Sequence, residues 1–488
     1  MTQKEMQSIL EIGTAISSEK DYNRLLEMIL NRIMELTHAD AGTLYLADGD
    51  LLRFKIMCNN TMHTCEGGDG KEPNLPPVRM SRENVCAMCY LENRTVCIEN
   101  VRTSTEYDFS GPVRYDAMTG YHTQSMLVVP MHNRQGERLG VIQLINAMDA
   151  AGNICAFPAD IIPAVESVAS QAAITIQNVL YIENIKELFE SFVRVMSSAV
   201  DERTPYNASH TRHMVEYGRH FIDYLNETAK AEGREPWFDA EHRHELLMSV
   251  WLHDIGKLVI PLEVMNKEAR LLPEQKSEIL HRFEKMRLLA QIACLKGAIS
   301  GEALEKRLEE LKQDGDTILR ANTAGFCPDD LREEICRIRE KTYTEEDGSE
   351  KPWLEEEEFQ MLMIRKGTLS EKERAVMESH VVITDKLLSE IRFSKELSHV
   401  REWAASHHEF LNGSGYPEHL MAEQIPMEVR IITILDIFDA LVADDRPYKP
   451  GMTVEKALGI LDIMADKEGK LDPELTRLFR KSRCWEKD

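Results

Sequence analysis

The chain has 488 residues, of which 43% are hydrophobic and 29% are charged. At roughly 150 residues for a typical domain, this length predicts two to four domains, and the apolar content excludes a chain that is disordered throughout. Asp and Glu number 83 against 58 Lys and Arg, so the formal charge is −25. This balance argues against polymeric nucleic acid and anionic membranes as partners, since both bind basic surfaces. A small phosphate ester stays compatible with it, through a metal ion or a local basic cluster.

The N-terminal region lacks an apolar core long enough for a signal peptide. No run of roughly eighteen uncharged apolar residues occurs either, so we expect no membrane span and a cytoplasmic protein. The 10 cysteines are then expected to be reduced thiols. Cys86 and Cys89 form a CxxC pair close to Cys58, Cys65 and Cys97. A zinc or redox site is one interpretation, but ordinary thiols are favoured because no second matched pair occurs.

The first part of the chain shows a mixed α and β pattern. Apolar residues from Leu25 to Leu36 recur at helical spacing, and the pattern ends near Thr37. Strand-like runs begin at Gly42 and Leu51, with an Asp-Gly-Asp turn between them. This arrangement predicts a hairpin that follows a helix.

A second hairpin is predicted further along the chain. Its strand-like runs begin at Ser125 and Leu139 and flank the turn-forming segment from Asn133 to Gly136. A helical pattern with one apolar stripe then covers about residues 160–200. Its length suits a helix that leaves one domain, enters the next and pairs in a parallel dimer, although a simple surface helix is the alternative.

Beyond Phe189 the pattern is helical, without convincing alternating strands. We therefore expect an all-helical second domain over about residues 190–480. About residues 266–366 differ from the rest, because they are charged, rich in Leu and Glu, and poor in chemically suggestive groups. We expect an insertion of helical hairpins there, with solvated faces and a small core of its own. Covering the cleft or recruiting a partner are the alternative roles.

Histidines and aspartates in apolar helical surroundings are the informative feature of the second half. A single histidine on an apolar face is more often a core residue with one hydrogen bond. Two doublets and three singletons would leave too many buried polar groups to satisfy separately, whereas a shared metal centre satisfies them together. The candidate metal ligands are His210, His253, Asp254, His380, His407, His408 and Asp436.

The doublets favour two metal ions over one. Neighbouring residues on a helix diverge by about 100°, so His253 and Asp254 can address two ions lying side by side. Mixed imidazole and carboxylate ligands suit Fe, Mn, Zn or Ni. Two adjacent ions activate water and neutralise charge in the hydrolysis of phosphate esters, so the pattern predicts a dinuclear metal phosphohydrolase.

Three segments carry a specific resemblance: HDIGK at 253–257, HHEFLNGSGYP at 407–417 and DIFDALVADDRPY at 436–448. Together they resemble the HD-GYP domain, a branch of the HD phosphohydrolases, over about residues 190–265 and 366–470. The resemblance implies an all-α domain that cleaves a cyclic dinucleotide, chiefly cyclic di-GMP, to pGpG or GMP. The alternatives are cyclic GMP-AMP or another nucleotide as substrate, and a non-catalytic signalling scaffold.

The resemblance also implies roles for individual residues. The candidate ligands named above fall on the family's metal ligands, Asp254 is in addition a catalytic residue, and Lys257 falls on the catalytic Lys that touches the scissile phosphate. The glycine, tyrosine and proline at 415–417 form the GYP loop, and two basic residues match positions that meet substrate phosphates. The implied substrate-binding residues are Lys257, Gly415, Tyr416, Pro417, Arg446 and Lys449.

Some members of that family hold a third metal through a Glu four residues before the first His, where this chain has Tyr206. A phenol is a poor ligand at neutral pH, so we expect two divalent ions, Fe or Mn, with Zn or Ni as alternatives. For Asp439, a hydrogen bond to a ligand and a solvent-facing carboxylate are equally open. The histidines expected to be ordinary surface residues are His213, His242 and His244.

The first domain resembles a GAF domain through TGYHTQSMLVVPM at 119–131, GVIQLINA at 140–147, Phe157 and Asp160. This resemblance implies a sensory module with a central antiparallel sheet that binds a small ligand and often dimerises. The cyclic-nucleotide motif is incomplete, because Asn146 is followed by Ala and Asp160 by Ile. The GAF ligand therefore stays open, and an empty dimerisation scaffold is an equal alternative.

The sequence as a whole predicts an α+β chain in three parts. A GAF sensory domain occupies about residues 1–180, a connecting helix about 160–200, and a catalytic HD-GYP domain about 190–480. We expect a homodimer in which a GAF ligand shifts the connecting helices and thereby the activity.

Overall fold

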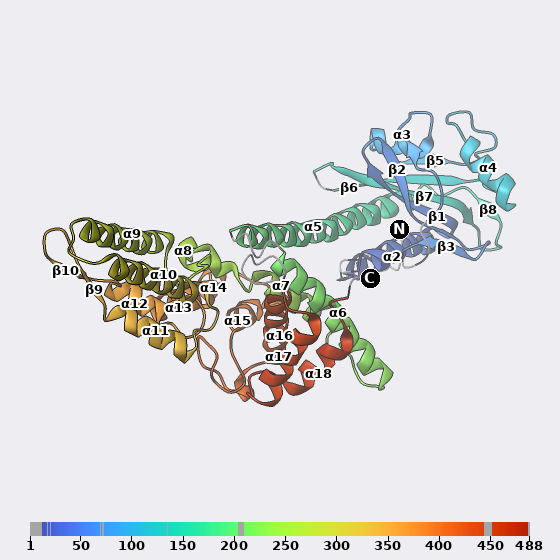
Figure 1. Cartoon of the computed structure of the whole chain (residues 1–488). Helices are drawn as coiled ribbons and strands as arrows, with labels where there is room; N and C mark the ends of the chain where they lie inside the picture. Colours follow the sequence, from blue (N-terminus) through green and yellow to red (C-terminus); the bar gives the residue numbers. More distant parts are fainter. Residues whose placement is uncertain are drawn as a thin grey trace. The chain divides into compact units, whose positions relative to one another are not determined.

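The computed structural model divides into two compact units, Met1–Phe189 and Glu190–Asp488. It describes residues 12–486 apart from 17, 20, 69, 71, 72, 134, 204–208 and 444–450. The first unit combines a sheet with helices and the second is built mainly of helices (Figure 1). In the described part of the chain, no helix combines the length and the apolarity that a bilayer span requires.

An antiparallel sheet forms the centre of the first unit. Its strands follow the order β3-β2-β1-β7-β6-β5, with β4 paired to β2 and β8 paired to β7. The strands are β1 (Ala39–Asp48), β2 (Leu51–Asn59), β3 (Thr64–Gly67), β4 (Val78–Arg79), β5 (Val96–Ile98), β6 (Met126–His132), β7 (Arg138–Met148) and β8 (Ile154–Cys155). The two predicted hairpins are confirmed as the pairs β1–β2 and β6–β7.

Helices cover the two faces of this sheet. On one face α2 (Tyr22–Thr37) and the first turns of α5 (Ile162–Asp201) share a core that includes Leu44. On the other face α3 (Val85–Glu92) packs on Tyr45, and α4 (Ser110–Thr119) follows β5 in the chain. Leu44 and Tyr45 reach opposite cores because successive strand residues point to opposite faces. The helix expected to end near Thr37 is confirmed, and the αL residue His38 caps it.

The cysteines of the first unit differ from the expectation. Cys58 and Cys65 are register partners on β2 and β3 and form a disulfide, so the prediction of reduced thiols throughout is wrong. Only the strand pairing brings these two residues together, and the sequence did not reveal it. Cys86 and Cys89 are buried free thiols, and burial raises the pKa of Cys86 to about 12. Among the described residues, no group that could hold a metal includes either thiol.

Helix α5 confirms the long helix expected from the apolar stripe, with 40 residues from Ile162 to Asp201. Its first part is buried in the core of the first unit, as Val165, Val168 and Ile176 show. Beyond this part, a set of large apolar side chains is more than half exposed. These side chains are Tyr181, Ile182, Ile185, Leu188, Phe192 and Val195.

The second unit packs its helices around a core that includes Phe221, Ile432 and Phe438. These residues come from α6 (His210–Ala231) and α16 (Met427–Val442). The other elements of this part are α7 (Ala240–Leu252), the 3-10 turn η1 (Ile255–Leu258), α8 (Leu262–Met265), α14 (His380–Leu388), η2 (Lys395–Leu397), α15 (Val400–Ala405), η3 (Ala422–Gln424), α17 (Val454–Asp466) and α18 (Pro473–Ser482).

The segment between α8 and α14 has a separate core around the fully buried Trp353. Its elements are α9 (Pro273–Leu295), α10 (Gly301–Thr323), α11 (Asp329–Arg339), β9 (Thr342–Thr344), β10 (Glu350–Pro352), α12 (Glu356–Leu362) and α13 (Glu371–Glu378). The helical hairpins and the small core are as expected. The short hairpin β9–β10 corrects the prediction of a strand-free second domain, because three-residue strands are too short to show a period of two.

Candidate functional site

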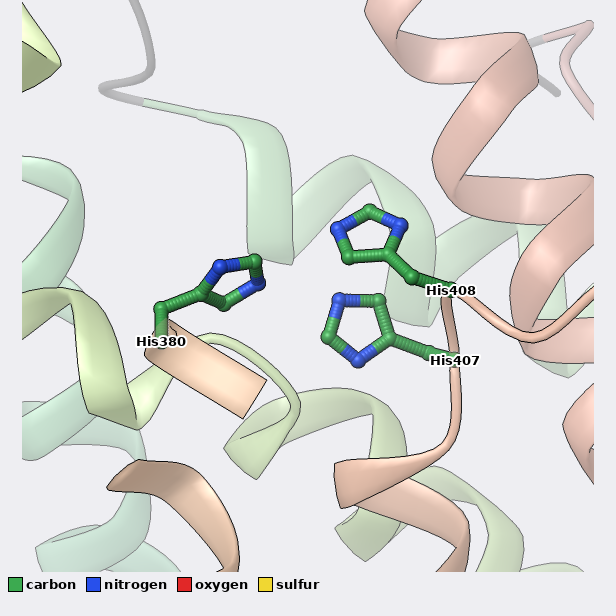
Figure 2. A group of neighbouring side chains, drawn as sticks. All are labelled: His380, His407 and His408. Carbon is green, nitrogen blue, oxygen red and sulfur yellow. The ribbon is translucent and has the colours of Figure 1, made fainter. Parts of the chain in front are cut away.

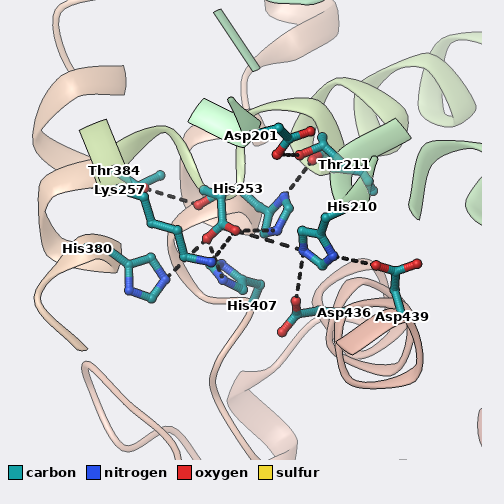
Figure 3. Close-up of polar contacts among 12 residues, drawn as sticks. Asp201, His210, Thr211, His253, Lys257, His380, Thr384, His407, Asp436 and Asp439 are labelled. Carbon is teal, nitrogen blue, oxygen red and sulfur yellow. Dashed lines mark hydrogen bonds and ion pairs between the residues drawn. The ribbon is translucent and has the colours of Figure 1, made fainter. Parts of the chain in front are cut away.

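The predicted ligands converge from five segments of the second unit (Figure 3). His210 begins α6, His380 begins α14, and Asp436 lies in α16. The pair 253–254 directly follows the last residue of α7, and the pair 407–408 follows α15 after Ser406. The expectation that the doublets lie within helices is therefore corrected: each lies in the turn that ends a helix.

Two groups of side chains have their donor atoms close enough to share a metal ion. In each group, the ligand atoms all lie within 4.8 Å of one another. One group is His380, His407 and His408, whose rings come together in Figure 2. The other group is His210, His253 and Asp254. His408 also lies near Asp436, with 3.7 Å between Nδ1 and Oδ2.

Three of the imidazoles are held in the same way. The Nδ1 atoms of His253, His380 and His407 each lie 2.7 Å from the backbone carbonyl three residues earlier in the chain. A carbonyl oxygen only accepts a hydrogen bond, so each Nδ1 carries the proton and donates it. The opposite ring atom, Nε2, is then an unprotonated donor for a metal. In all three residues Nε2 is buried and has no hydrogen-bond partner.

These free lone pairs face the carboxylate of Asp254. Its Oδ2 lies 3.3 Å from Nε2 of His253, and its Oδ1 lies 3.4 Å from Nε2 of His380. An imidazole lone pair and a carboxylate oxygen are both acceptors and cannot satisfy each other. Buried acceptors that face one another are costly unless a cation lies between them. The residues present therefore fit a divalent metal.

Burial keeps the imidazoles of the His380, His407 and His408 group neutral. It lowers the pKa of His380 to about 4 and that of His407 well below its ordinary value. The pKa of His408 is also lowered, again mainly by burial. Metal coordination requires the unprotonated ring, so these shifts keep the ligands ready at neutral pH.

The carboxylates stay charged. Burial opposes the ionisation of Asp254, but Lys257 and His253 outweigh it and hold its pKa well below the usual range. Lys257 lies in η1, and its ammonium forms an ion pair with Asp254. Burial likewise opposes the charge on Lys257, while Asp254 and Asp436 raise the pKa of its ammonium. The predicted catalytic pair is thus in direct contact.

His210 is held between two carboxylates of α16. Its Nδ1 donates to Oδ2 of Asp439 at 2.6 Å, and its Nε2 lies 3.3 Å from Oδ1 of Asp436. Burial alone would lower the pKa of His210, but these carboxylates raise it to about 10. Asp439 is only 1% exposed, which decides between the two interpretations left open for it in favour of the bond to a candidate ligand. Such a bond fixes the orientation of the ring.

The GYP loop lies against the histidine doublet. Gly415 packs so closely on the backbone of residues 408–410 that a Cβ atom would overlap it. The ring of Tyr416 lies 4.8 Å from that of His408, centre to centre, and Pro417 follows through a cis peptide bond. Buried Glu409 holds the loop, because its carboxylate accepts from the backbone N–H groups of residues 418 and 420.

Some of the sequence predictions fall elsewhere. Tyr206, Arg446 and Lys449 lie outside the described residues. His242 is one-third exposed and contacts Glu428, with 2.6 Å between Nε2 and Oε1. It therefore pairs with Glu428 and not with the candidate metal ligands. His213 and His244 are each about two-fifths exposed; His213 approaches Asp439 at 3.4 Å, and His244 approaches Glu190 at 3.8 Å.

Two supporting residues were missed by the sequence analysis. The hydroxyl of Thr384 accepts from the N–H of Gly256 at 3.0 Å and donates to the carbonyl of His253 at 3.1 Å. The hydroxyl of Thr433 donates to the carbonyl of His407 at 2.8 Å. Both threonines bind the backbone of a ligand doublet from another helix. No signal in the sequence marks these threonines, because their contacts arise from packing between helices.

The first unit contains a cavity of about 360 Å³ lined by residues that include Asp40, Tyr121 and Asn146. The hydroxyl of Tyr121 donates to Oδ2 of Asp40 at 2.6 Å, and Nδ2 of Asn146 donates to that hydroxyl at 3.1 Å. Thr61 donates to the other carboxylate oxygen of Asp40 at 2.8 Å. Here the polar groups satisfy one another.

Comparison with protein families finds two matches. A GAF domain matches residues 21–176, and an HD domain matches residues 357–475. The second range includes His380, the 407–408 doublet and Asp436. His210 and the 253–254 doublet precede it in the chain and join it only through the fold.

Curated relatives match a short stretch of this chain. The cyclic di-GMP phosphodiesterase response regulator RpfG of Xanthomonas campestris is 41% identical over 102 residues, which are 20% of this chain and 26% of RpfG. The 3'3'-cGAMP-specific phosphodiesterase 3 of Vibrio cholerae is 35% identical over 121 residues, 25% of each chain. The chain thus spans about a quarter of the length of these relatives.

Among solved structures, the GAF domain from an Acinetobacter phosphoenolpyruvate-protein phosphotransferase is similar to the first unit. It is 15% identical, covers 38% of this chain and 99% of its own, and has a TM-score of 0.29. At this level the similarity carries no functional argument.

Proposed function

We propose that this chain, which contains a GAF domain followed by an HD domain, is a metal-dependent phosphodiesterase that hydrolyses a cyclic dinucleotide. Cyclic di-GMP is the first candidate substrate, and the relatives named above make 3'3'-cGAMP the second. The observation that carries the proposal is the set of three buried imidazole Nε2 atoms without hydrogen-bond partners, aimed at the carboxylate of Asp254. A metal-free structural role leaves these atoms unsatisfied.

The proposed ligands divide between two neighbouring divalent ions, with Asp254 between the two groups. Fe and Mn are the first candidates because the donors are imidazole and carboxylate without thiolate. Ions bound there would supply the Lewis acidity that activates water and neutralises charge on the phosphodiester. The carboxylates of Asp254 and Asp436 balance the cationic charge, and Asp439 orients His210.

The protein side chains complete the substrate site in this proposal. Lys257 would exchange its ion pair with Asp254 for contact with the scissile phosphate, because a metal competes for the same carboxylate. Tyr416 and Pro417 would contact the nucleotide beside His408, and Gly415 lets this loop approach closely. Arg446 and Lys449 would meet the substrate phosphates.

We further propose a parallel homodimer through α5. The residues at 181, 185, 188, 192 and 195 alternate in steps of four and three, which is the a/d spacing of a coiled coil. They are between 54% and 71% exposed in the single chain. The g positions of this seam are the uncharged Asn184, Ser191 and Ser198, so no like charges oppose pairing. Leu188→Glu should convert the dimer to a monomer in light scattering, and an unchanged mass would contradict the dimer.

In this proposal the GAF domain senses a small ligand and the protein acts in the cytoplasm as a signalling enzyme. The cavity around Asp40, Tyr121 and Asn146 is the candidate ligand site. Its polar groups could exchange their mutual hydrogen bonds for bonds to a polar ligand.

The test is turnover by the full chain, reconstituted anaerobically with Mn²⁺ or Fe²⁺ and supplied with either dinucleotide. We expect linear dinucleotide or mononucleotide products, separated by chromatography, with Asp436→Asn as the inactive control. Metal-loaded protein that turns over neither dinucleotide would contradict the proposal. Protein that binds no metal would favour a signalling scaffold.

A further inference from the structure

The end of α5 contacts backbone next to the metal centre, and the function proposed above leaves these contacts without a role. Arg203 lies two residues beyond the end of α5 and stays tied to the helix, because its N–H donates to the carbonyl of Val200 at 3.1 Å. Its guanidinium donates to the carbonyl of Lys257 at 2.6 Å and to that of Ile260 at 3.1 Å. The side chain of Arg203 therefore binds two carbonyls on the C-terminal side of the turn that carries Lys257.

The same turn is held from its opposite side by α14. The N–H of Gly256 donates to Thr384, and a Cβ on Gly256 would overlap the carbonyl of His380. The turn is thus clamped between α14 and Arg203. The Gly256 contact is close backbone packing against His380, so it cannot change without displacing His380. The Arg203 contact involves a side chain, so its loss can move Lys257 and leave His380 in place.

A second contact of α5 reaches the residue after His210. Asp201 is 6% exposed, and its Oδ1 accepts from the hydroxyl of Thr211 at 3.0 Å. Thr211 is 1% exposed. This bond fixes the first turn of α6, where His210 reaches the centre (Figure 3).

We propose that Arg203 and Asp201 are positioning residues through which α5 sets the places of Lys257 and His210. This inference rests on the proposed phosphodiesterase function and adds its route of regulation. Helix α5 begins in the core of the first unit and ends at these two contacts, so a shift of α5 along its axis changes both. A displacement of about 1 Å at a catalytic group can cost up to about a hundredfold in rate.

The test compares Arg203, just beyond the end of α5, with Arg194 inside that helix, in the full, metal-loaded chain. Arg203→Ala removes both carbonyl contacts, and we expect kcat to fall about tenfold while KM and metal content stay within about twofold. Arg203→Lys can restore one contact and should recover part of the rate. The matched control is Arg194→Ala, which removes an exposed arginine paired with Glu190 and should match the wild type.

A second readout separates this inference from the proposed function. Hydrogen exchange of residues 255–260 should become faster in Arg203→Ala and stay unchanged in Arg194→Ala. Inactive wild-type protein would refute the proposed function alone, and the exchange rate would then decide the positioning role. If Arg203→Ala keeps the kcat of an active wild type, or if its 255–260 segment exchanges at the wild-type rate, the inference is overturned. If Arg203→Ala fails to fold, Arg203→Lys is judged by the same two readouts.

Discussion

Each of the two units contains a buried polar cluster, and the clusters differ in whether every acceptor has a donor. Around Asp40, donors from Thr61 and Tyr121 meet both carboxylate oxygens. Around Asp254, the lone pairs of His253 and His380 face the carboxylate, so acceptors meet acceptors. The first cluster is complete as a protein structure. The second is complete only when cations are added.

This difference separates a cluster whose acceptors are satisfied by the chain from one whose imidazole lone pairs are not. Unsatisfied buried polar groups cost stability and persist in folded proteins mainly where function requires them. The contrast predicts that the same kind of substitution has different consequences in the two units.

Removing the carboxylate at the centre should have the largest effect. Asp254→Ala takes away the group that both sets of imidazoles face, so we expect loss of bound metal and a fall in turnover of about a thousandfold or more. Metal analysis and product chromatography measure the two effects. Asp40→Asn changes the corresponding carboxylate of the first unit and should leave both unchanged. An Asp254→Ala protein with wild-type metal content would contradict the claim that the Asp254 cluster, unlike the Asp40 cluster, holds metal.

Chelation should destabilise the second unit. An ion present at a hundred times its dissociation constant stabilises a fold by about 2.7 kcal/mol, and this amount is lost when the ion is removed. Calorimetry of the full chain with and without chelator should show a lower melting temperature for one transition. The same comparison on Asp254→Ala should show no shift. If the chelator lowers the melting temperature of the wild type and of Asp254→Ala equally, the shift arises from a source other than this site.

Acid should destabilise the metal-free second unit. Burial lowers the pKa of His380 to about 4 from an ordinary value of 6.5. Between these values the unfolded chain binds a proton that the folded chain does not, so stability is complete above about pH 6.5 and is lost as pH falls toward 4. From pH 7 to 5 we expect a loss of about 2 kcal/mol in the free energy of unfolding, measured with denaturant. The chelated His380→Phe variant should show a smaller loss, and an equal loss would contradict the assignment.

The smallest effect is expected in the satisfied cluster. Tyr121→Phe removes the hydroxyl that joins Asp40 to Asn146 and should cost the first unit about 1 kcal/mol, the usual value of one hydrogen bond. Turnover and metal content should remain at wild-type values without GAF ligand. A loss of metal in this variant would contradict the independence of the two clusters.

Much of the fold could be predicted because its signals are local. The hairpins β1–β2 and β6–β7 follow from strand runs around turn residues, and α2 follows from its apolar spacing. Two features depend on strand register over only a few residues: the pairing of Cys58 with Cys65 and the short hairpin β9–β10. Hydrophobic periodicity in the sequence does not reveal this register.

For the site, the sequence identified residue types that the fold brings together, but not how they are held. The seven candidate ligands were recognised through motifs. The donor atoms of six of them gather in two groups from distant segments, and Asp436 lies beside both groups. The turns that present the doublets, and the carbonyl bonds that fix each Nδ1, depend on where α7 and α15 end. The roles of Asp439 and Thr384 depend on packing between helices, and this packing cannot be derived from one sequence without its fold.

The most direct test of the central claim is the metal stoichiometry of the full chain. Protein reconstituted with Mn²⁺ or Fe²⁺ and freed of unbound metal would be measured by inductively coupled plasma mass spectrometry. Two ions per chain, lost together in Asp254→Ala, are the predicted result. A chain that retains no ion, or that retains the same number in Asp254→Ala, would contradict the assignment of this cluster as a dinuclear metal centre.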